Sequence, residues 1–306
     1  MSKPLSGLLV VSLEQAVAAP MCTCRLADAG ARVIKIERPE GDFARGYDKL
    51  ARGESAYFVW LNRGKESVVL DLTKADDKAL LEKMLARADV FIQNLKPGAI
   101  GKLGFAIERL RRDYPKLICV SISGFGESGP EAHRPGYDLI VQGESGVMDI
   151  TGFPDGPPVK VGNSIGDLVA GMAAAQGITL ALLSREKTGK GQKVEIGMLD
   201  VMASLLTYQA GLYWNGGGRP ARRGNEHPSI VPYEVFKAQD VYITLGVANN
   251  SLWDRTCKAL DRPDLIKDPR FDTEANRVTN RKVLVPLLNE ILRALPSWSA
   301  SSFARR

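Results

Sequence analysis

Residues 7–39, "GLLVVSLEQAVAAPMCTCRLADAGARVIKIERP", decide the fold of this chain. Two short runs rich in β-branched residues flank a segment of helical composition, and Gly30 stands where that helix should stop. A strand, a helix and a second strand in this order predict a βαβ unit with two parallel strands. The question is how far the rest of the chain repeats it.

The same pattern continues downstream. Residues 67–72 and 89–95 are strand-like, and residues 74–88 between them have the apolar spacing of an amphipathic helix. A short helix around residues 107–115 then leads to another β-branched run at 116–126. Strands that alternate with helices predict an α/β fold with a doubly wound, Rossmann-like parallel sheet, whose ligands bind at the carboxyl ends of the strands.

Composition changes at residues 215–228, "NGGGRPARRGNEHP", and this change predicts a domain linker. Residues 1–214 before it would form the large α/β domain. Residues 229–306 after it would form a smaller α+β domain, because 229–236 and 241–247 have the pattern of a β-hairpin and helical segments follow.

Charge and composition exclude several classes of protein. The net charge of +6 comes from 41 basic and 35 acidic residues that never form a run, which argues against a nucleic-acid partner and suits a small polyanion. We expect no segment long and apolar enough to cross a membrane, since even the most apolar helical stretch carries Asp167 and Gln176. The cysteines lack a framework spacing, which favours reduced thiols and a cytoplasmic location; they are Cys22, Cys24, Cys119 and Cys257.

Few motifs for catalysis are present. His133 and His227 are the only histidines, and the chain lacks G-x-S-x-G, H-E-x-x-H, G-x-G-x-x-G and phosphate-loop patterns. Histidine-based triads and histidine-rich metal sites are therefore disfavoured. We expect no metal and no prosthetic group, and a carboxylate becomes the leading catalytic candidate.

Asp167 is that candidate. It opens the apolar, small-residue run "IGDLVAGMAAAQGITLALL" at 165–183, after a flexible lead that contains Gly162 and Gly166. The dipole of the helix favours the ionised carboxylate at this position, which predicts a nucleophile. An aspartate there also serves as a simple helix cap, and the pattern alone does not separate the two roles.

Basic and amide side chains follow several of the predicted strands and would converge on one crevice. Arg38, Lys74, Lys96 and Lys102 could bind phosphates there, although each is also compatible with a solvated surface charge.

Seven ordered motifs across nearly the whole chain resemble the family III CoA-transferases, the group that contains formyl-CoA:oxalate and carnitine CoA-transferases. The motifs are "PLSGLLVVSLEQAVAAPMCTCRLADAGARVIKIERP", "FVWLNRGKESVVLDL", "ADVFIQNLKPGAIGKLGF", "SISGFGESGP", "RPGYDLIVQGESGVMDITG", "IGDLVAGMAAAQGI" and "KTGKGQKVEIGMLDVM".

The resemblance implies a reaction and a set of site residues. Asp167 matches the aspartate that the family acylates, and the reaction passes through aspartyl anhydrides and an aspartyl-CoA thioester. It uses the CoA thioester as substrate, a small carboxylic acid as acceptor and no prosthetic group. The matching CoA-binding positions are Val17, Arg38, Leu72 to Lys74, Asn94, Leu95 and Tyr137.

Two departures narrow the substrate. Val17 stands where formyl-CoA transferase has a glutamine, and the tetraglycine loop of that enzyme is absent, which argues against an oxalate-specific role. Residues 224–236 and 241–253 are instead similar to the branch acting on dicarboxylates such as succinate, glutarate and hydroxymethylglutarate. Arg223, His227 and Ser229 would then help to recognise the distal carboxylate.

Two alternatives stay open. α-Methylacyl-CoA racemases of the same superfamily carry a "GHD" motif where this chain has Gly136-Tyr137-Asp138, and tyrosine is a poor base at neutral pH. The family also continues beyond the small domain with a return segment that completes an interlocked homodimer, whereas this chain stops at "ALPSWSASSFARR". A truncated CoA-binding remnant without catalysis is therefore the second alternative.

Overall fold

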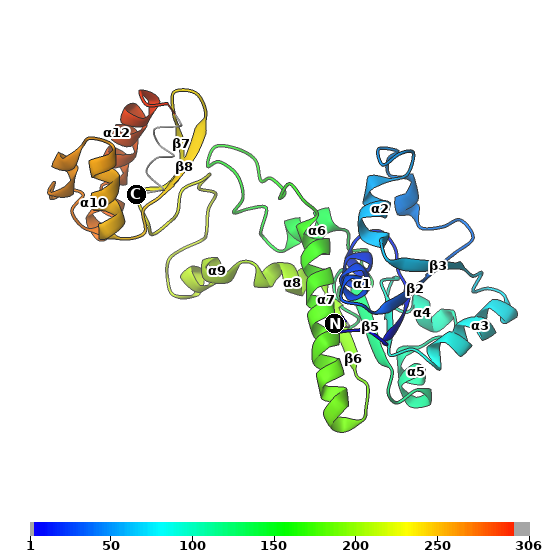
Figure 1. Ribbon diagram of the computed structural model, residues 1–306. Helices are drawn as coiled ribbons and strands as arrows, with labels where there is room; N and C mark the ends of the chain where they lie inside the picture. Colours follow the sequence, from blue (N-terminus) through cyan, green and yellow to red (C-terminus); the bar gives the residue numbers. More distant parts are fainter. Residues whose placement is uncertain (1–2, 297–306) are drawn as a thin grey trace. The chain divides into compact units, whose positions relative to one another are not determined.

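A parallel sheet of six strands forms the larger part of the protein. The computed structural model describes residues 3–296, and within them the sheet has the order β3-β2-β1-β4-β5-β6 (Figure 1). This is the strand order of the Rossmann fold, so the predicted doubly wound parallel sheet is confirmed. The strands are β1 (Leu9–Leu13), β2 (Arg32–Glu37), β3 (Lys65–Val69), β4 (Val90–Gln93), β5 (Ile118–Ser123) and β6 (Lys193–Gly197).

Helices cover both faces of this sheet. Successive residues of a strand point to opposite faces, so each strand contributes to two cores. Val10 and Val33 belong to the core shared with α1, α7 and α8, whereas Val11 and Ile34 belong to the core shared with α3, α4 and α5. The helices of this part are α1 (Ala18–Asp28), α2 (Ala56–Asn62), α3 (Ala75–Leu85), α4 (Ala99–Lys102), α5 (Ile107–Asp113), α6 (Asp138–Glu144), α7 (Ile165–Thr188), α8 (Met198–Ser204) and α9 (Thr207–Trp214), with a 3-10 turn, η1 (Phe43–Gly46).

Small residues let α7 lie close to its neighbours. A Cβ on Gly171 would stand 2.6 Å from the carbonyl oxygen of Ala18 in α1, and one on Gly177 would stand 2.7 Å from a methyl carbon of Val194 in β6. With 24 residues and a mean hydropathy of 1.5, α7 is the one described helix long and apolar enough to span a membrane. The prediction that no segment reaches this length and composition is therefore wrong. One face of α7 nevertheless forms part of the core beside the sheet.

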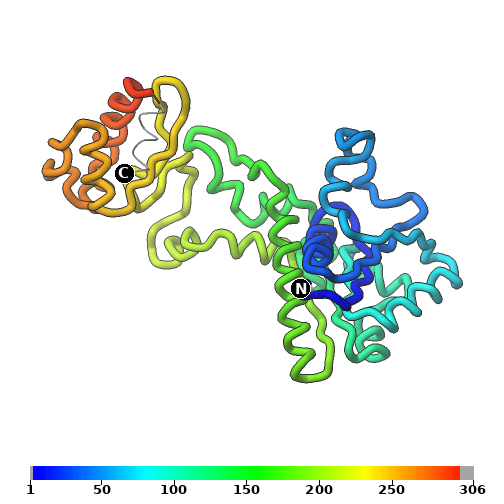
Figure 2. The backbone as a smooth tube through the Cα atoms, viewed as in Figure 1, coloured from blue at the N-terminus to red at the C-terminus, as the bar shows by residue number. Residues whose placement is uncertain are grey.

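The chain divides into two compact units, and Figure 2 traces the backbone through them from the N-terminus to the C-terminus. The first contains 1–149 and 159–220, and the second contains 150–158 together with the chain from 221 onward. The predicted boundaries, 1–214, 215–228 and 229–306, differ from this division in two respects. Residues 150–158 cluster with the second unit, and the predicted linker is divided, with 215–220 in the first unit and 221–228 in the second.

The second unit combines a hairpin with helices. Strands β7 (Tyr233–Lys237) and β8 (Tyr242–Gly246) pair antiparallel at the predicted hairpin positions. Trp253 and Phe236 are fully buried in its core. Its helices are α10 (Asn250–Ala259), η2 (Pro263–Ile266), α11 (Glu274–Thr279) and α12 (Arg281–Arg293). The terminal stretch that prompted the expectation of a missing return segment is 294–306, and from 297 onward it lies outside the described residues.

Two glycines let the loop after β5 pass against the segment that leads into α6. A Cβ on Gly124 would lie 2.3 Å from the Cα of Gly136, and one on Gly136 would lie 2.2 Å from the Cα of Gly124. Such a contact between two backbones cannot be relieved by a side-chain rotation. The crossing fixes where Tyr137 and α6 begin.

We expect Gly124→Ala to lower the free energy of unfolding by about 1–3 kcal/mol, since overpacking forces the backbone to shift. Chemical denaturation measures this loss. Gly101→Ala is the matched control, because its new Cβ would have its nearest neighbour, the Ala106 Cβ, at an ordinary 3.8 Å. The control should stay within about 0.5 kcal/mol of the wild type or be more stable. Equal stability of the two variants would contradict the close backbone contact between Gly124 and Gly136.

Candidate active site

A pocket of about 340 Å³ opens at the carboxyl ends of the central strands. This is the edge of a doubly wound sheet at which ligands bind. The walls are formed by the residues that end or follow β1, β2, β3 and β4, together with one residue near α4: Leu13, Glu14, Gln15, Ile36, Glu37, Arg38, Pro39, Glu40, Gly41, Asp42, Leu70, Asp71, Leu72, Thr73, Leu95 and Leu103.

Four of the predicted CoA-binding residues line this pocket together: Arg38, Leu72, Thr73 and Leu95. The Nε of Arg38 donates to the carbonyl oxygen of Gly41 at 3.1 Å, and its side chain is half exposed. Within residues 3–296 its terminal Nη atoms have no hydrogen-bond partner, so they remain available to an anion.

Asn94 and Lys74 take other places. The side-chain amide of Asn94 accepts from the backbone N–H of Gln15 and donates to its carbonyl oxygen, both at 2.9 Å, and so holds the turn between β1 and α1. Lys74 precedes α3 with an exposed side chain, 3.4 Å from the carboxylate of Asp71 on the pocket wall. Val17 is buried immediately before α1.

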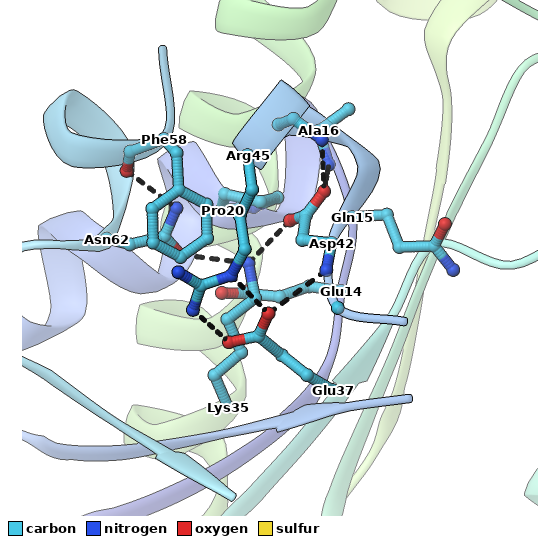
Figure 3. Close-up of polar contacts among 12 residues, drawn as sticks. Glu14, Gln15, Ala16, Pro20, Lys35, Glu37, Asp42, Arg45, Phe58 and Asn62 are labelled. Atoms are coloured by element: carbon cyan, nitrogen blue, oxygen red, sulfur yellow. Dashed lines mark hydrogen bonds and ion pairs between the residues drawn. The ribbon is translucent and has the colours of Figure 1, made fainter. Parts of the chain in front are cut away.

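A buried network of ion pairs contributes Glu14, Glu37 and Asp42 to the pocket wall, and Figure 3 shows its contacts around Lys35. Lys35 in β2 donates to Asp42 at 2.6 Å, and Lys65 in β3 donates to Glu14 at 2.6 Å; all four side chains are almost completely buried. Asn62 accepts from both lysines, at 2.9 and 3.2 Å. Burying a charge is costly unless it is paired and hydrogen-bonded, and each of these is.

Glu37 closes the network at the end of β2. Arg45 binds both of its carboxylate oxygens, at 2.7 and 2.9 Å, and Ser67 and the N–H of Asp42 add two more hydrogen bonds. Burial opposes ionisation, but these donors outweigh it and lower the pKa of Glu37 to about 2. The buried carboxylates of the pocket are thus neutralised from within the protein, which reduces their repulsion of an anionic ligand.

Asp167 lies apart from this network, in the first turn of α7. Within the described part of the chain its carboxylate takes part in no hydrogen bond or ion pair. Burial, followed by the negative charge of Asp138, raises the pKa of Asp167 from 3.8 to about 7. The prediction that the helix start favours the ionised form is therefore wrong in direction, because burial and a like charge outweigh the helix dipole.

Asp138, the first residue of α6, connects the two helices. Its Oδ1 accepts the backbone N–H of Gly166 at 2.8 Å and its Oδ2 accepts the side-chain amide of Gln142 at 2.7 Å. Only a glycine fits at 166, since a Cβ there would lie 2.9 Å from a methyl carbon of Val141. Asp138 therefore sets the position of the residue directly before Asp167.

Tyr47, just after η1, is a site residue that the sequence analysis missed. Burial and the charge of Asp42 raise the pKa of its phenol, with further contributions from Asp167 and Tyr137. Its ring meets that of Tyr57 edge-on, with the ring centroids 5.6 Å apart. Tyr47 thus lies in the electrostatic reach both of a pocket residue and of the candidate nucleophile. Tyr137 itself is exposed before α6.

The residues suggested for a distal carboxylate lie in the second unit. There His227 accepts the N–H of Ser229 at 3.1 Å through Nδ1, and its ring centroid lies 5.3 Å from that of Tyr233. Among residues 3–296 no group of three or more His, Cys, Asp or Glu side chains is arranged to hold a metal ion.

Comparison with known proteins identifies the family. The model of CoA-transferase family III matches residues 5–303. Acetyl-CoA:oxalate CoA-transferase of Acetobacter aceti is 43% identical, and the alignment covers 96% of this chain and 76% of that protein. Succinyl-CoA:glutarate CoA-transferase of Mus musculus is 39% identical, and the alignment covers 94% of this chain and 66% of that protein. A solved CAIB/BAIF family protein from Brucella suis superposes with a TM-score of 0.88 at 38% identity, covering 100% of this chain and 82% of that one. The chain belongs to CoA-transferase family III.

Proposed function

We propose that this protein transfers coenzyme A from an acyl-CoA thioester, succinyl-CoA or a similar donor, to a dicarboxylic acid. Family membership supports the reaction class, and relatives named for oxalate and glutarate support a dicarboxylic acceptor. The relative named for oxalate returns this acid to the candidate acceptors, although Val17 and the missing tetraglycine loop argue against it. A homodimer and a cytoplasmic location complete the proposal.

The observation that carries the proposal is the carboxylate of Asp167. It stands unpaired at the start of a helix, beside a like charge, and its raised pKa makes it more basic than an ordinary aspartate. A more basic carboxylate is a better nucleophile, and at neutral pH a large fraction of it is still ionised. A structural helix cap would instead bond to the free N–H groups of its own helix.

The proposed steps move charge between oxygen and sulfur. A carboxylate oxygen of Asp167 attacks the thioester carbonyl carbon and the C–S bond breaks. CoA departs as the thiolate, and Asp167 is left as an aspartyl-acyl anhydride. The thiolate attacks the aspartyl carbonyl and releases the donor acid, which gives the aspartyl-CoA thioester. The acceptor carboxylate then displaces thiolate to form a second anhydride, and thiolate attacks the acceptor carbonyl to give the new thioester and free Asp167. No prosthetic group takes part.

The pocket would hold the CoA moiety. The Nη atoms of Arg38, which bond to nothing within residues 3–296, would bind a phosphate, while its Nε faces Gly41 and lies 3.9 Å from Glu40; Leu72 and Leu95 offer apolar walls. Because anhydrides and thioesters hydrolyse readily, the reacting centre must exclude water. Tyr47, Tyr57 and Phe43 form a run of ring contacts that could cover it.

A second copy of this chain is the partner that we propose for the exposed apolar surface of the first unit. Met172, Leu180 and Leu183 of α7 are 45–58% exposed, and no residue of α9 is buried, including Trp214 at 78% exposure. Apolar helix faces of this extent normally bury against another surface.

We expect incubation with succinyl-CoA, followed by hydroxylamine, to modify Asp167 as its hydroxamate, detected by peptide mass spectrometry. Asp167→Asn should show no adduct. Asp76→Asn is the matched control, because Asp76 also lies in the first turn of a helix, and it should react as the wild type does. A wild type that stays unmodified but exchanges the α-proton of an acyl-CoA would indicate a racemase. A wild type that shows no turnover with oxalate, glutarate or another dicarboxylate would contradict the proposal.

The raised pKa of Asp167 predicts a pH-dependent stability. Between 3.8 and about 7 the folded protein binds more protons at this group than the unfolded chain does, so its contribution to the free energy of unfolding falls as pH rises. Asp167→Asn has no group that titrates here, so this decrease in the free energy of unfolding is absent from the variant. In urea denaturation the variant should gain stability over the wild type progressively through this pH window and keep a constant advantage above it. A difference that does not vary with pH would contradict the assignment.

The dimer proposal predicts that charged substitutions on the exposed face of α7 break the dimer and so lower the molar mass of the particle in solution. Leu180→Glu combined with Leu183→Glu should shift light-scattering mass from two chains towards one, since buried unpaired charges are costly. Leu50→Glu is the control, because Leu50 is 85% exposed outside this face. A wild type that is monomeric at every concentration tested would refute the proposal.

A further inference from the structure

Asp138 is held rigidly next to the candidate nucleophile. One of its oxygens accepts the Gly166 N–H and the other accepts the amide of Gln142. Gln142 is fully buried and is itself fixed, because its Oε1 accepts the N–H of Val161 at 2.9 Å. The carboxylate of Asp138 therefore cannot turn away when Asp167 becomes charged.

Asp138 is also the charge that acts on Asp167. Burial is the larger cause of the raised pKa of Asp167, and within residues 3–296 Asp138 is the one charge that adds to it. Tyr47 lies within reach of Asp167 from η1. The other titratable side chains on the elements packed against α7 make no contribution to this shift; they are Cys22, Cys24, Arg25 and Asp28 on α1, Glu144 on α6, Cys119 on β5, Lys193 and Glu195 on β6, and Asp200 on α8.

Resting on the function proposed above, we propose that Asp138 is a positioning residue whose fixed negative charge favours the covalently loaded form of Asp167 over its free carboxylate. The free enzyme has two carboxylates close together, whereas the loaded enzyme has one. Asp138 would thus act on the covalent equilibrium without touching the substrate.

The charge balance of the reaction gives the reason. When the oxygen of Asp167 bonds to the acyl carbon and the C–S bond breaks, the electron pair leaves on sulfur, and Asp167 becomes neutral. It stays neutral in the anhydrides and in the CoA thioester. Acylation and protonation both remove the negative charge of Asp167, so the repulsion that favours the proton also favours the acyl group.

This argument makes the effect of Asp138 dependent on pH. Above the pKa of about 7, free Asp167 is ionised and feels the repulsion, so loading relieves it. Well below that pKa the free group is already protonated, and neither form is repelled. Asp138 should therefore favour loading in alkaline solution and have no influence in acid.

The experiment measures the loaded fraction by intact-protein mass spectrometry at a fixed ratio of succinyl-CoA to succinate. Asp138→Asn keeps a side-chain oxygen for the Gly166 N–H but has no charge. At about pH 8 its ratio of loaded to free enzyme should fall below that of the wild type, and at about pH 5 the two ratios should converge. Asp138→Ser is a second uncharged variant in case the first folds poorly.

A separate measurement makes the prediction quantitative. Titration of the Asp167 carboxyl carbon by ¹³C NMR, assigned with Asp167→Asn, gives the pKa in each variant without any substrate. Each unit by which Asp138→Asn lowers this pKa should lower the loaded-to-free ratio about tenfold at high pH. Glu144→Gln is the matched control: it removes an exposed negative charge, paired with Arg134, from the same helix, and should change neither quantity.

The outcomes are distinct. An unchanged high-pH ratio in Asp138→Asn, with a wild type that loads, would show that Asp138 only holds the helix and would overturn this inference alone. A fall of the same size at both pH values would also overturn it, because lost geometry does not depend on the charge of Asp167. A wild type that never loads with any acyl-CoA would refute the proposed function and the inference with it.

Discussion

The hydrogen bond from the N–H of Gly166 to Asp138 is the contact on which the candidate site depends. It joins α6 to the start of α7 and thereby sets where Asp167 lies. The contact is possible only because glycine stands at 166, and α6 itself is placed by the crossing of Gly124 and Gly136. Three glycines thus determine where the carboxylate of the candidate nucleophile lies, and Asp138, which sets that position, also repels its negative charge.

Much of the fold could be predicted from the sequence, because apolar strand runs and amphipathic helices depend on local patterns. Asp167 became the candidate nucleophile in the same way, as a carboxylate at the predicted start of an apolar helix, and the structure places it in the first turn of α7. Its raised pKa was not predicted, since the burial that mainly causes it arises only in the folded chain, and the like charge that adds to it comes from Asp138, 29 positions earlier in the chain. Contacts between distant segments leave no periodic signal.

The buried ion pairs left a signal that was not recognised. Lys35 and Glu37 alternate with Ile34 and Ile36 in β2, and therefore point to the same face of the sheet as Val33. Charged residues at inward positions of a central strand indicate internal partners. Tyr47, by contrast, follows a short 3-10 turn with no motif around it, and only the folded chain brings it near Asp167.

Glu37 has a consequence for the kind of ligand that this sheet accepts. In dinucleotide-binding proteins of the same strand order, an acidic residue after the second strand hydrogen-bonds the ribose hydroxyls. Here the acidic residue exists, but Arg45, Ser67 and the Asp42 N–H occupy its oxygens. The usual ribose acceptor has become part of the scaffold, and the next residue, Arg38, faces the pocket with a donor in its place. The end of β2 thus offers the pocket a guanidinium donor at position 38, while the acidic side chain at position 37 is already fully bonded within the protein.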